Sequence, residues 1–282
     1  TRDLRDTISV IIVAGACGIA AGTPLAILGG IGRAARLGSI IKGGIHLETL
    51  GRIDTVILDK TGTLTYGEPR VQSVQTASGF NADTVLSLAA SAELHSEHPL
   101  ARAVVQAAQD KGLKVVEQTD FSYQLGRGIT ATIGGHRLLI GNQKLLRDAG
   151  IPVPDRTTLP TGSDILVGID GRYGGKIEVA DQIRPEAASA MQALAEMGIK
   201  TILLTGDITP VAQKVAQDLS IAEFLADLLP EDKLNYVRQR VAQNHAVAMV
   251  GDGVNDAPAL SAATLGIAMG SGTDIAKETA QI

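Results

Sequence analysis

The stretch VILDKTGTLT, at residues 56–65, decides the fold of this chain. Its first three residues are apolar, as in a buried strand, and Asp59 follows them at once. The small residues after Asp59 let backbone N–H groups approach the oxygens of a phosphate. Ligands of open α/β sheets bind at the carboxyl ends of the strands. The stretch therefore predicts a buried parallel strand that ends in a carboxylate nucleophile.

Three further segments place reactive side chains beside strand-like runs. TGD, at residues 205–207, and GDGVND, at residues 251–256, each follow an apolar run, and Lys233 follows LPED at residues 229–232. A lone DKT is compatible with an ordinary turn, and a lone lysine is usually a solvated residue. Because all the segments fit one sheet edge, we expect Asp59, a hydroxyl, a lysine and two more carboxylates to meet there.

Together these segments resemble the phosphorylation domain of P-type ATPases, which are cation pumps on a haloacid-dehalogenase-like fold. SEHPL, at residues 96–100, resembles the nucleotide-domain motif of the heavy-metal-transporting branch. The resemblance runs from about Ile8 to the last residue. It implies an α/β fold: a haloacid-dehalogenase-like Rossmannoid parallel sheet, an inserted α+β nucleotide-binding domain and an N-terminal transmembrane helix.

The resemblance also assigns roles to the phosphorylation motifs. Asp59 is expected to attack the γ-phosphate of ATP and to become an aspartyl phosphate. Mg²⁺ is expected on the carboxylates of Asp59 and Asp252 and on the backbone carbonyl of Thr61. Lys233 resembles the lysine that holds the transferring phosphoryl group. The other catalytic positions implied in this way are Lys60, Thr61, Thr205, Gly206, Asp207, Asn255 and Asp256.

A nucleotide site is implied within the segment 71–176. Glycines let the backbone come close to a ligand, and a histidine can stack on it or hydrogen-bond to it. Taken singly, these residues have structural explanations, because Gly-x-Gly is frequent in hairpins and a histidine before Pro99 can cap a helix. The positions matched by the resemblance are Glu93, His98, Gly126, Gly128, Ile129, Gly141 and Asn142.

Thr61 separates two classes of enzyme. Soluble phosphatases of this fold generally carry a second Asp two residues after the nucleophile, where it acts as general acid and base. This chain has Thr61 at that position. Without a built-in base, water attacks an acyl phosphate slowly, and a pump needs that delay. Thr61 therefore argues against a soluble haloacid-dehalogenase-like phosphatase, which stays the second hypothesis. A nucleotide-binding regulatory fragment is the third.

Residues 8–31 contain no charged side chain, and this run is long enough to cross a bilayer as a helix. A buried Gly/Ala-rich core helix is the alternative. Arg33, Arg36 and Lys42 follow the run and predict that the next segment is cytoplasmic. We therefore expect a lipid bilayer as partner and a location at the cell membrane, with the catalytic domains in the cytoplasm.

The domain organisation expected from these patterns is that of a catalytic fragment. Residues 1–36 form the transmembrane helix and its flank, residues 37–70 and 177–282 the phosphorylation domain, and residues 71–176 the nucleotide-binding domain. One span makes no transport pathway, and the Thr-Gly-Glu tripeptide of the actuator domain does not occur. We expect the actuator domain and the remaining transmembrane helices of the same pump to be missing partners of this chain.

The membrane segment departs from the family at its metal-binding tripeptide. Heavy-metal pumps usually carry Cys-Pro-Cys, a pair of soft thiolate ligands; the corresponding residues here are GAC, at residues 15–17. Cys17 is a candidate ligand of the transported heavy-metal ion, and a small buried apolar residue is the alternative. We expect the exported ion to be either Zn²⁺ (and Cd²⁺) or Cu⁺. We expect Pro24 to interrupt the helix.

The composition agrees with a packed, charged-surface protein that does not bind nucleic acid. Of its 282 residues, 45% are hydrophobic and 20% charged, and the formal net charge is −5. No long basic run occurs, so nucleic acid is not expected as a partner. Cys17 is the only cysteine, which excludes an intramolecular disulfide.

Helix-like and strand-like runs alternate after residue 181, which indicates a parallel sheet with crossover helices. The expected helices span 185–197, 210–219 and 231–244, and the expected strands 201–204 and 246–250. In the preceding segment we expect helices at 83–95 and 99–111, a hairpin at 126–140 that turns at Gly134-Gly135, and a second pair of strands around Asp170-Gly171. Tyr66 to Arg70 is expected to form a hinge rich in turn residues.

Overall fold

The structure is a computed structural model that describes residues 3–96, 98–154, 162–253 and 255–282. The chain divides into two compact units. One contains Thr1–Thr63, Gln192–Gly206 and Leu228–Ile282, and the other contains Leu64–Met191 and Asp207–Asp227. The functional boundaries expected from the sequence stay a prediction.

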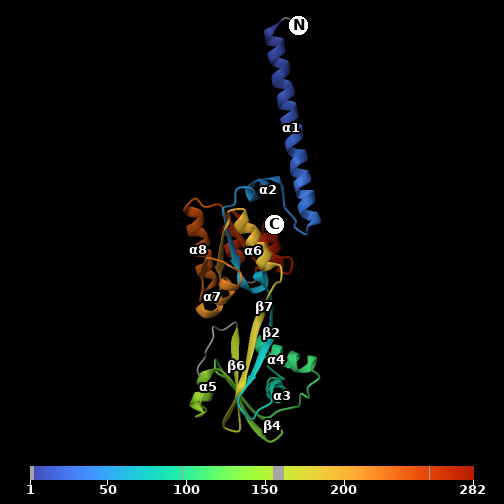
Figure 1. Cartoon of the computed structure of the whole chain (residues 1–282). Coiled ribbons are helices and arrows are strands. Elements are labelled where there is room, and N and C mark those ends of the chain that lie inside the picture. Colours follow the sequence, from blue (N-terminus) through green and yellow to red (C-terminus); the bar gives the residue numbers. More distant parts are fainter. Residues whose placement is uncertain (1–2, 97, 155–161, 254) are drawn as a thin grey trace. The chain divides into compact units, whose positions relative to one another are not determined.

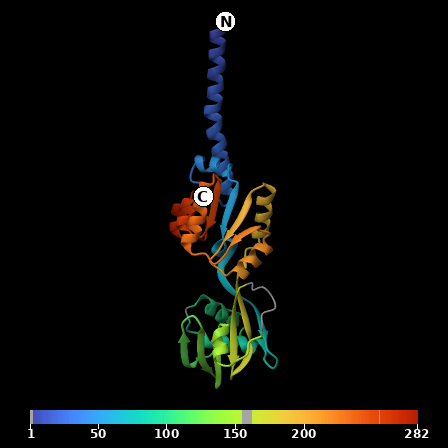
Figure 2. The same ribbon diagram turned by 90° about the vertical axis from the view of Figure 1, so that its left-hand side faces the viewer.

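A five-stranded sheet carries the DKTGTLT segment. β1 lies at its centre and pairs in parallel with β10 on one side and β8 on the other (Figure 2). All five residues of β1 are buried, as expected for a strand covered on both faces. The strands, in order across the sheet, are β11 (Leu265–Ala268), β10 (Val247–Gly251), β1 (Thr55–Asp59), β8 (Lys200–Leu204) and β9 (Glu223–Leu225).

Helices alternate with these strands along the chain, as the sequence predicts. They are α2 (Gly44–Leu50), α6 (Ala187–Glu196), α7 (Thr209–Asp218), α8 (Pro230–Ala242), α9 (Ala257–Ala262) and α10 (Asp274–Thr279). Proline stands in the first turn of α7, α8 and α9, where its missing N–H has no partner to lose.

The second sheet has six antiparallel strands. In order they are β2 (Thr65–Thr76), β7 (Arg172–Ile183), β6 (Ser163–Ile169), β5 (His136–Gly141), β4 (Gly128–Ile133) and β3 (Thr119–Gln124). One face packs against α3 (Ala82–Ala92) and α4 (Pro99–Asp110) in a large apolar core (Figure 1). The other face packs against α5 (Gln143–Asp148) through a smaller cluster that includes Leu139 and Leu145.

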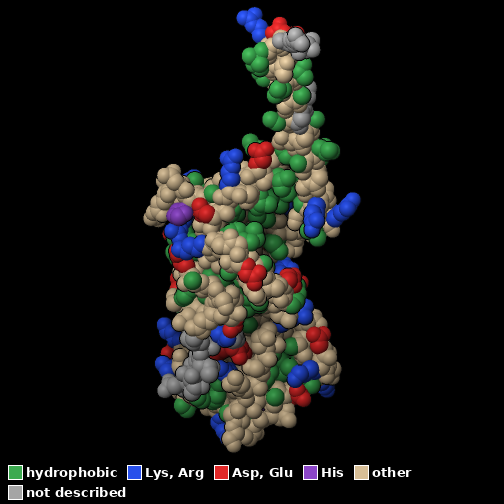
Figure 3. All heavy atoms as spheres, turned by 45° about the horizontal axis from the view of Figure 1, so that its top comes forward, with side chains coloured by type: hydrophobic (Ala, Val, Ile, Leu, Met, Phe, Trp, Pro, Cys, Tyr) green, Lys and Arg blue, Asp and Glu red, His purple; other side chains and the backbone are tan. Residues whose placement is uncertain are grey.

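The N-terminal helix α1 (Leu4–Arg36) is long and apolar enough to cross a membrane. None of its apolar window is buried, and hydrophobic side chains gather along it in the space-filling view (Figure 3). Arg33 and Arg36 lie in its last turn, where they complement the helix dipole. Pro24, where we expected an interruption, lies inside one continuous helix; a proline removes only one bond of the ladder.

Two local expectations differ from the structure. The helix expected at 83–95 is α3, which spans Ala82–Ala92, and its N-cap is Asn81, whose side chain accepts from the N–H of Asp83. Tyr66 to Arg70 belongs to strand β2, although a register irregularity separates Thr65 from Pro69. The turn residues of this stretch therefore mark a break in the ladder and not a loop.

Candidate active site and nucleotide site

Asp59 is the last residue of β1, and its side chain is only 7% exposed. The residues Lys60–Leu64 turn sharply after it, and Thr61 and Gly62 leave helical geometry. Gly62 has a φ of +71°, and a Cβ there would lie 2.4 Å from Oδ2 of Asp252. Only glycine fits this position, because the Asp252 carboxylate presses against the loop.

Lys233 joins two carboxylates of this site. It lies in the first turn of α8, is 7% exposed, and donates its Nζ to Oδ1 of Asp59 at 2.5 Å and to Oδ1 of Asp256 at 2.8 Å. Asp232 fixes the start of the helix, because its carboxylate accepts the N–H of Leu229 at 2.9 Å. The lysine expected from the LPEDK stretch is therefore brought to Asp59.

The local charges keep this lysine protonated. Burial and the neighbouring Asp256 raise the pKa of Asp59 to about 6, against the lowering effect of Lys233 and of the Lys60 backbone N–H. Burial lowers the pKa of Lys233, but the two carboxylates outweigh burial, so the net direction is upward. At neutral pH the pair is therefore a carboxylate beside an ammonium group.

The carboxylates of Asp59, Asp252 and Asp256 fit a hard divalent cation. Their ligand atoms all lie within 4.8 Å of one another. Asp256 is buried, and its Oδ2 has no hydrogen-bond partner among the described residues. One lysine leaves this group of three acids with excess negative charge, and Mg²⁺ prefers carboxylate oxygens. Asp256 thus lies beside Asp59 and Asp252, the two carboxylates that we expected to hold the cation, and could serve with them.

The TGD segment follows the strand that pairs with the end of β1 at Asp59. The register of β1 and β8 pairs Asp59 with Leu204, so the buried Thr205 is one residue further along. The carbonyl of Thr205 accepts the N–H of Leu228 at 3.1 Å, and that of Asp207 accepts the N–H of Asp227 at 2.8 Å. Gly206 is exposed between them. These two backbone hydrogen bonds fix the loop at residues 205–207 against residues 227–228.

The remaining phosphorylation positions differ in exposure. Lys60 is buried, whereas Thr61 is exposed within the loop after Asp59. Asn255 is exposed on the loop before α9. Sequence reasoning missed the packing role of Gly251, where a Cβ would lie 2.8 Å from Oδ2 of Asp256. The signal was a glycine directly beside a motif carboxylate.

Four of the nucleotide positions meet where β4 and β5 pair. Gly128 faces Gly141; a Cβ on Gly128 would lie 2.1 Å from the carbonyl oxygen of Ile140, and one on Gly141 would lie 2.1 Å from that of Arg127. Asn142 donates its side-chain amide to the carbonyl of Gly126 at 2.8 Å and caps α5 by accepting the N–H of Leu145. The missing side chains of Gly128 and Gly141 therefore let these two segments of backbone approach closely.

Ile129 takes part differently from these neighbours. Its side chain is 2% exposed and belongs to the core under α3 and α4. Its side chain is therefore not available to a bound ligand. The side chain of Cys17, the candidate metal ligand, lies outside the part of the chain that the structure describes.

Glu93 and His98 flank the connection between α3 and α4. Burial raises the pKa of Glu93, against the effect of a hydrogen bond to Ser96. His98 caps α4, since its Nδ1 accepts the N–H of Leu100 at 3.2 Å. That bond leaves the ring proton on Nε2, which can donate to a ligand. Capping and ligand binding are therefore compatible roles for His98.

Residues 53–264 match the family of haloacid dehalogenase-like hydrolases. The chain belongs to this family. The match covers β1 and the carboxylate site at its end, and it confirms the α/β fold with a parallel sheet that the sequence predicted.

The most similar curated relatives include metal-exporting P-type ATPases. A manganese-exporting one from Mycobacterium leprae (strain TN) is 41% identical over 292 residues, which cover 100% of this chain and 40% of the relative. A zinc-exporting one from Mycobacterium marinum (strain ATCC BAA-535 / M) is 40% identical, with the same coverage of 100% and 40%. A copper-exporting one from Bacillus subtilis (strain 168) is 40% identical, over 98% of this chain and 35% of the relative. The chain thus spans well under half of their length.

Solved structures extend the likeness to three dimensions. A zinc-transporting PIB-type ATPase in the E2.Pi state gives a TM-score of 0.81 at 41% identity, over 94% of this chain and 44% of that one. The catalytic domain of the CPx-ATPase CopB-B gives a TM-score of 0.69 at 32% identity, over 89% of this chain and 92% of that one. The resemblance to heavy-metal P-type ATPases is confirmed.

Proposed function

We propose that this chain is the catalytic part of an ATP-driven heavy-metal export pump that works through an aspartyl phosphate on Asp59. The observation that carries the proposal is the buried cluster of Asp59, Lys233 and Asp256 at the end of β1. Its support comes from metal-exporting P-type ATPases that match the chain along its whole length.

The reaction assigned to the site is phosphoryl transfer. An Asp59 carboxylate oxygen attacks the γ-phosphorus of ATP and forms an acyl phosphate, while the bond from that phosphorus to the β,γ-bridging oxygen breaks and its electron pair leaves with ADP. Lys233 holds the phosphoryl oxygens and offsets their charge as they approach. Mg²⁺, when held by Asp59, Asp252 and Asp256, neutralises phosphate charge.

The ATP site is assigned to the six-stranded unit. Gly126, Gly128 and Gly141 present backbone without side chains, and His98 offers its Nε2–H to the nucleotide. The half-buried Glu93 supplies an acceptor for donors of the nucleotide. This division places ATP binding and phosphoryl transfer on different residues, so the two properties are separable by substitution.

Thr61 favours a pump over a soluble phosphatase. A threonine hydroxyl is a poor general base, so Thr61 cannot activate water against the acyl phosphate. The phosphorylated form is then long-lived, and the delay allows a change of shape before hydrolysis. Rapid turnover of small phosphate esters by the isolated chain is the result expected of the alternative function.

The transported ion is assigned to the heavy metals, with Zn²⁺ and Cd²⁺ or Cu⁺ as the leading candidates. Relatives are named as exporters of manganese, zinc and copper. One thiol, Cys17, is available in this chain, so further ligands must come from other membrane helices. The proposal places α1 in a lipid bilayer of the cell membrane, the catalytic units in the cytoplasm, and an actuator domain and further spans elsewhere in the pump.

The decisive test is the phosphoenzyme itself. With labelled ATP and Mg²⁺, the protein is expected to form an acid-stable, hydroxylamine-labile product on Asp59. Asp59→Asn should abolish labelling and leave ATP binding nearly unchanged. Asp274→Asn, at a fully exposed side chain of the same unit, is the matched control and should label normally. Label that persists in Asp59→Asn overturns the proposal.

A further inference from the structure

Arg127 stands between two of the assigned nucleotide positions, Gly126 and Gly128, in the loop that joins β3 to β4. Its N–H donates to the carbonyl of Gln124 at 3.0 Å, and its own carbonyl accepts the N–H of Asn142 at 2.8 Å. Asn142 is itself an assigned nucleotide position. The backbone of Arg127 is therefore fixed, and its side chain starts from a defined place beside the expected ligand.

The guanidinium of Arg127 pairs with the carboxylate of Asp148, the last residue of α5. Its Nη1 lies 2.6 Å from Oδ2 of Asp148, and the two side chains are 38% and 52% exposed. An ion pair exposed to this degree contributes little to stability. The bond also uses only one of the five N–H groups that a guanidinium offers. A second anion can therefore reach Arg127 from solvent and replace Asp148 at small cost.

The nucleotide positions assigned so far lack a cation for the phosphates of ATP. None of the seven is a lysine or an arginine. Glu93, the acid among them, disfavours phosphate and suits the donors at the base end of the nucleotide. Guanidinium groups bind phosphate through parallel charge-assisted hydrogen bonds. The loop that contains Arg127 therefore has the charge that suits the phosphate end of ATP.

We propose that Arg127 binds the phosphates of ATP and that the Asp148 carboxylate competes with them for its guanidinium. The inference rests on the proposed function and adds a phosphate-binding residue to the ATP site. Phosphate oxygens take the place of one carboxylate oxygen, so Arg127 has an anionic partner both before and after ATP binds.

The competition gives the two partners opposite effects on ATP affinity. Loss of Arg127 removes an attraction to phosphate. Loss of the Asp148 charge removes both a competitor and a nearby negative charge that repels phosphate. An ion pair that served only to hold the loop would behave differently, because removal of either partner would disturb the same loop and weaken binding. The sign of the Asp148 effect therefore separates the two roles.

Equilibrium titration of the full chain with ATP, AMP and adenosine tests the inference. Arg127→Gln should weaken ATP binding by about tenfold, the usual effect of losing a hydrogen bond to a charged group. It should weaken AMP binding less and leave adenosine binding unchanged. Arg127→Lys keeps the charge and should retain part of the ATP affinity. Asp148→Asn should strengthen ATP binding.

Arg147→Gln is the matched control, because it removes the same charge from an exposed residue of α5, and its ATP affinity should equal that of the wild type. Adenosine binding reports that the site of each variant is folded, and Asp148→Asn tests the inference independently of any change at Arg127. Equal weakening of ATP and adenosine binding in Arg127→Gln overturns the inference. So does ATP affinity that falls or stays the same in Asp148→Asn.

Labelling of Asp59 distinguishes a failure of this inference from a failure of the proposed function. If the wild type binds ATP as described but takes no label, the proposed function fails and the phosphate-binding role of Arg127 stands. If the wild type takes label and Arg127→Gln keeps full ATP affinity, the role of Arg127 alone fails. A wild type that binds no ATP overturns both.

Discussion

Lys233 is the residue on which the charge balance of the site depends. It bonds to two buried carboxylates, and removal of one partner from a buried ion pair typically destabilises a protein by about 3–5 kcal/mol. We predict that Lys233→Met lowers the free energy of unfolding by about 3 kcal/mol in urea denaturation and strongly reduces labelling of Asp59.

The matched control for this prediction is Lys214→Met. Lys214 pairs with Asp218 one helical turn away at the surface, so its loss should change the free energy of unfolding by about 0.5 kcal/mol or less. Equal losses in the two variants would contradict the assignment of Lys233 as the balancing charge of a buried cluster.

Glu93 should make stability depend on pH. Burial raises its pKa above the ordinary value of 4.5, so the folded state prefers the protonated acid. Ionisation of Glu93 therefore costs stability above that pH, and the cost disappears as the pH falls below it. We predict that Glu93→Gln raises the Tm at pH 7, not at pH 4, and weakens ATP binding. The control Glu196→Gln, at an exposed side chain, should leave the Tm unchanged at pH 7 and at pH 4. If Glu93→Gln raised the Tm at pH 4 and not at pH 7, the pKa of Glu93 would be lowered by folding, and the argument would be wrong.

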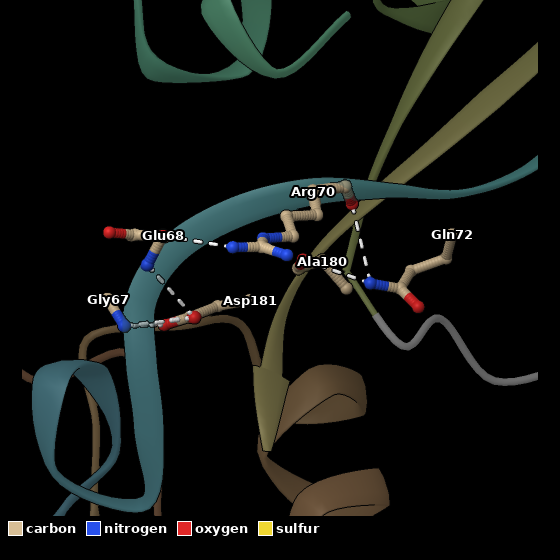
Figure 4. A network of polar contacts seen from close by, with 6 residues as sticks. All are labelled: Gly67, Glu68, Arg70, Gln72, Ala180 and Asp181. Atoms are coloured by element: carbon tan, nitrogen blue, oxygen red, sulfur yellow. Dashed lines mark hydrogen bonds and ion pairs between the residues drawn. The ribbon is translucent and has the colours of Figure 1, made fainter. Parts of the chain in front are cut away.

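At the scale of elements, some helices and strands follow from local sequence patterns, whereas others depend on contacts between residues far apart in the chain. β1 and the helices after residue 181 could be predicted because their apolar runs are continuous and their ends carry prolines or motif residues. The strand character of Tyr66 to Arg70 could not, since Gly67 and Pro69 read as turn residues. Only Asp181, far along the chain, gives the N–H groups of that stretch an acceptor (Figure 4).

In the candidate site, too, some features follow from local motifs and others from contacts between distant segments. Asp59, Asp252 and Lys233 could be assigned from motifs, because each lies at the end of a strand or the start of a helix. The bond between Lys233 and Asp256 depends on how α8 and α9 pack, and no local pattern encodes it. The motif therefore indicates Asp256 as a site residue, but its ion pair with Lys233 becomes visible only in the structure.

The pairing of β4 with β5 should leave no room for a side chain at Gly128. Its φ is +141°, and a Cβ would lie 2.1 Å from the carbonyl oxygen of Ile140. Gly135, in the turn of the same hairpin, has a φ of +88° and open space around it. We predict that Gly135→Ala costs about 1–2 kcal/mol from backbone strain alone, and that Gly128→Ala costs more and abolishes ATP binding. Equal unfolding free energies for the two variants would show that backbone approach does not matter at Gly128.

At the scale of the whole molecule, the six-stranded sheet has a large apolar core of its own. The core on the α3 and α4 side draws on β4, β5, β6 and β7, and it includes Ile177 and Val179, which are 0% and 1% exposed. Both residues lie beyond the boundary at Lys176 that the sequence predicted for the nucleotide-binding domain. β7 continues to Ile183 and pairs with β2 as far as Thr65. A compact domain defined by its core therefore begins near Thr65 and ends near Ile183.

These bounds can be tested with two segments, 65–183 and 71–176. The longer one keeps both core residues and the whole β2–β7 ladder, whereas the shorter one loses Ile177 and Val179. Burial of one such side chain contributes about 1.5–3 kcal/mol, so the loss of two approaches the whole stability of a domain of this size. We predict that 65–183 gives dispersed amide NMR signals that shift with ATP near Glu93, His98 and Gly128. The segment 71–176 should give collapsed signals and bind ATP weakly or not at all. A well-folded 71–176 with full ATP affinity would place the boundary at Lys176 and make the end of β7 part of the phosphorylation domain alone.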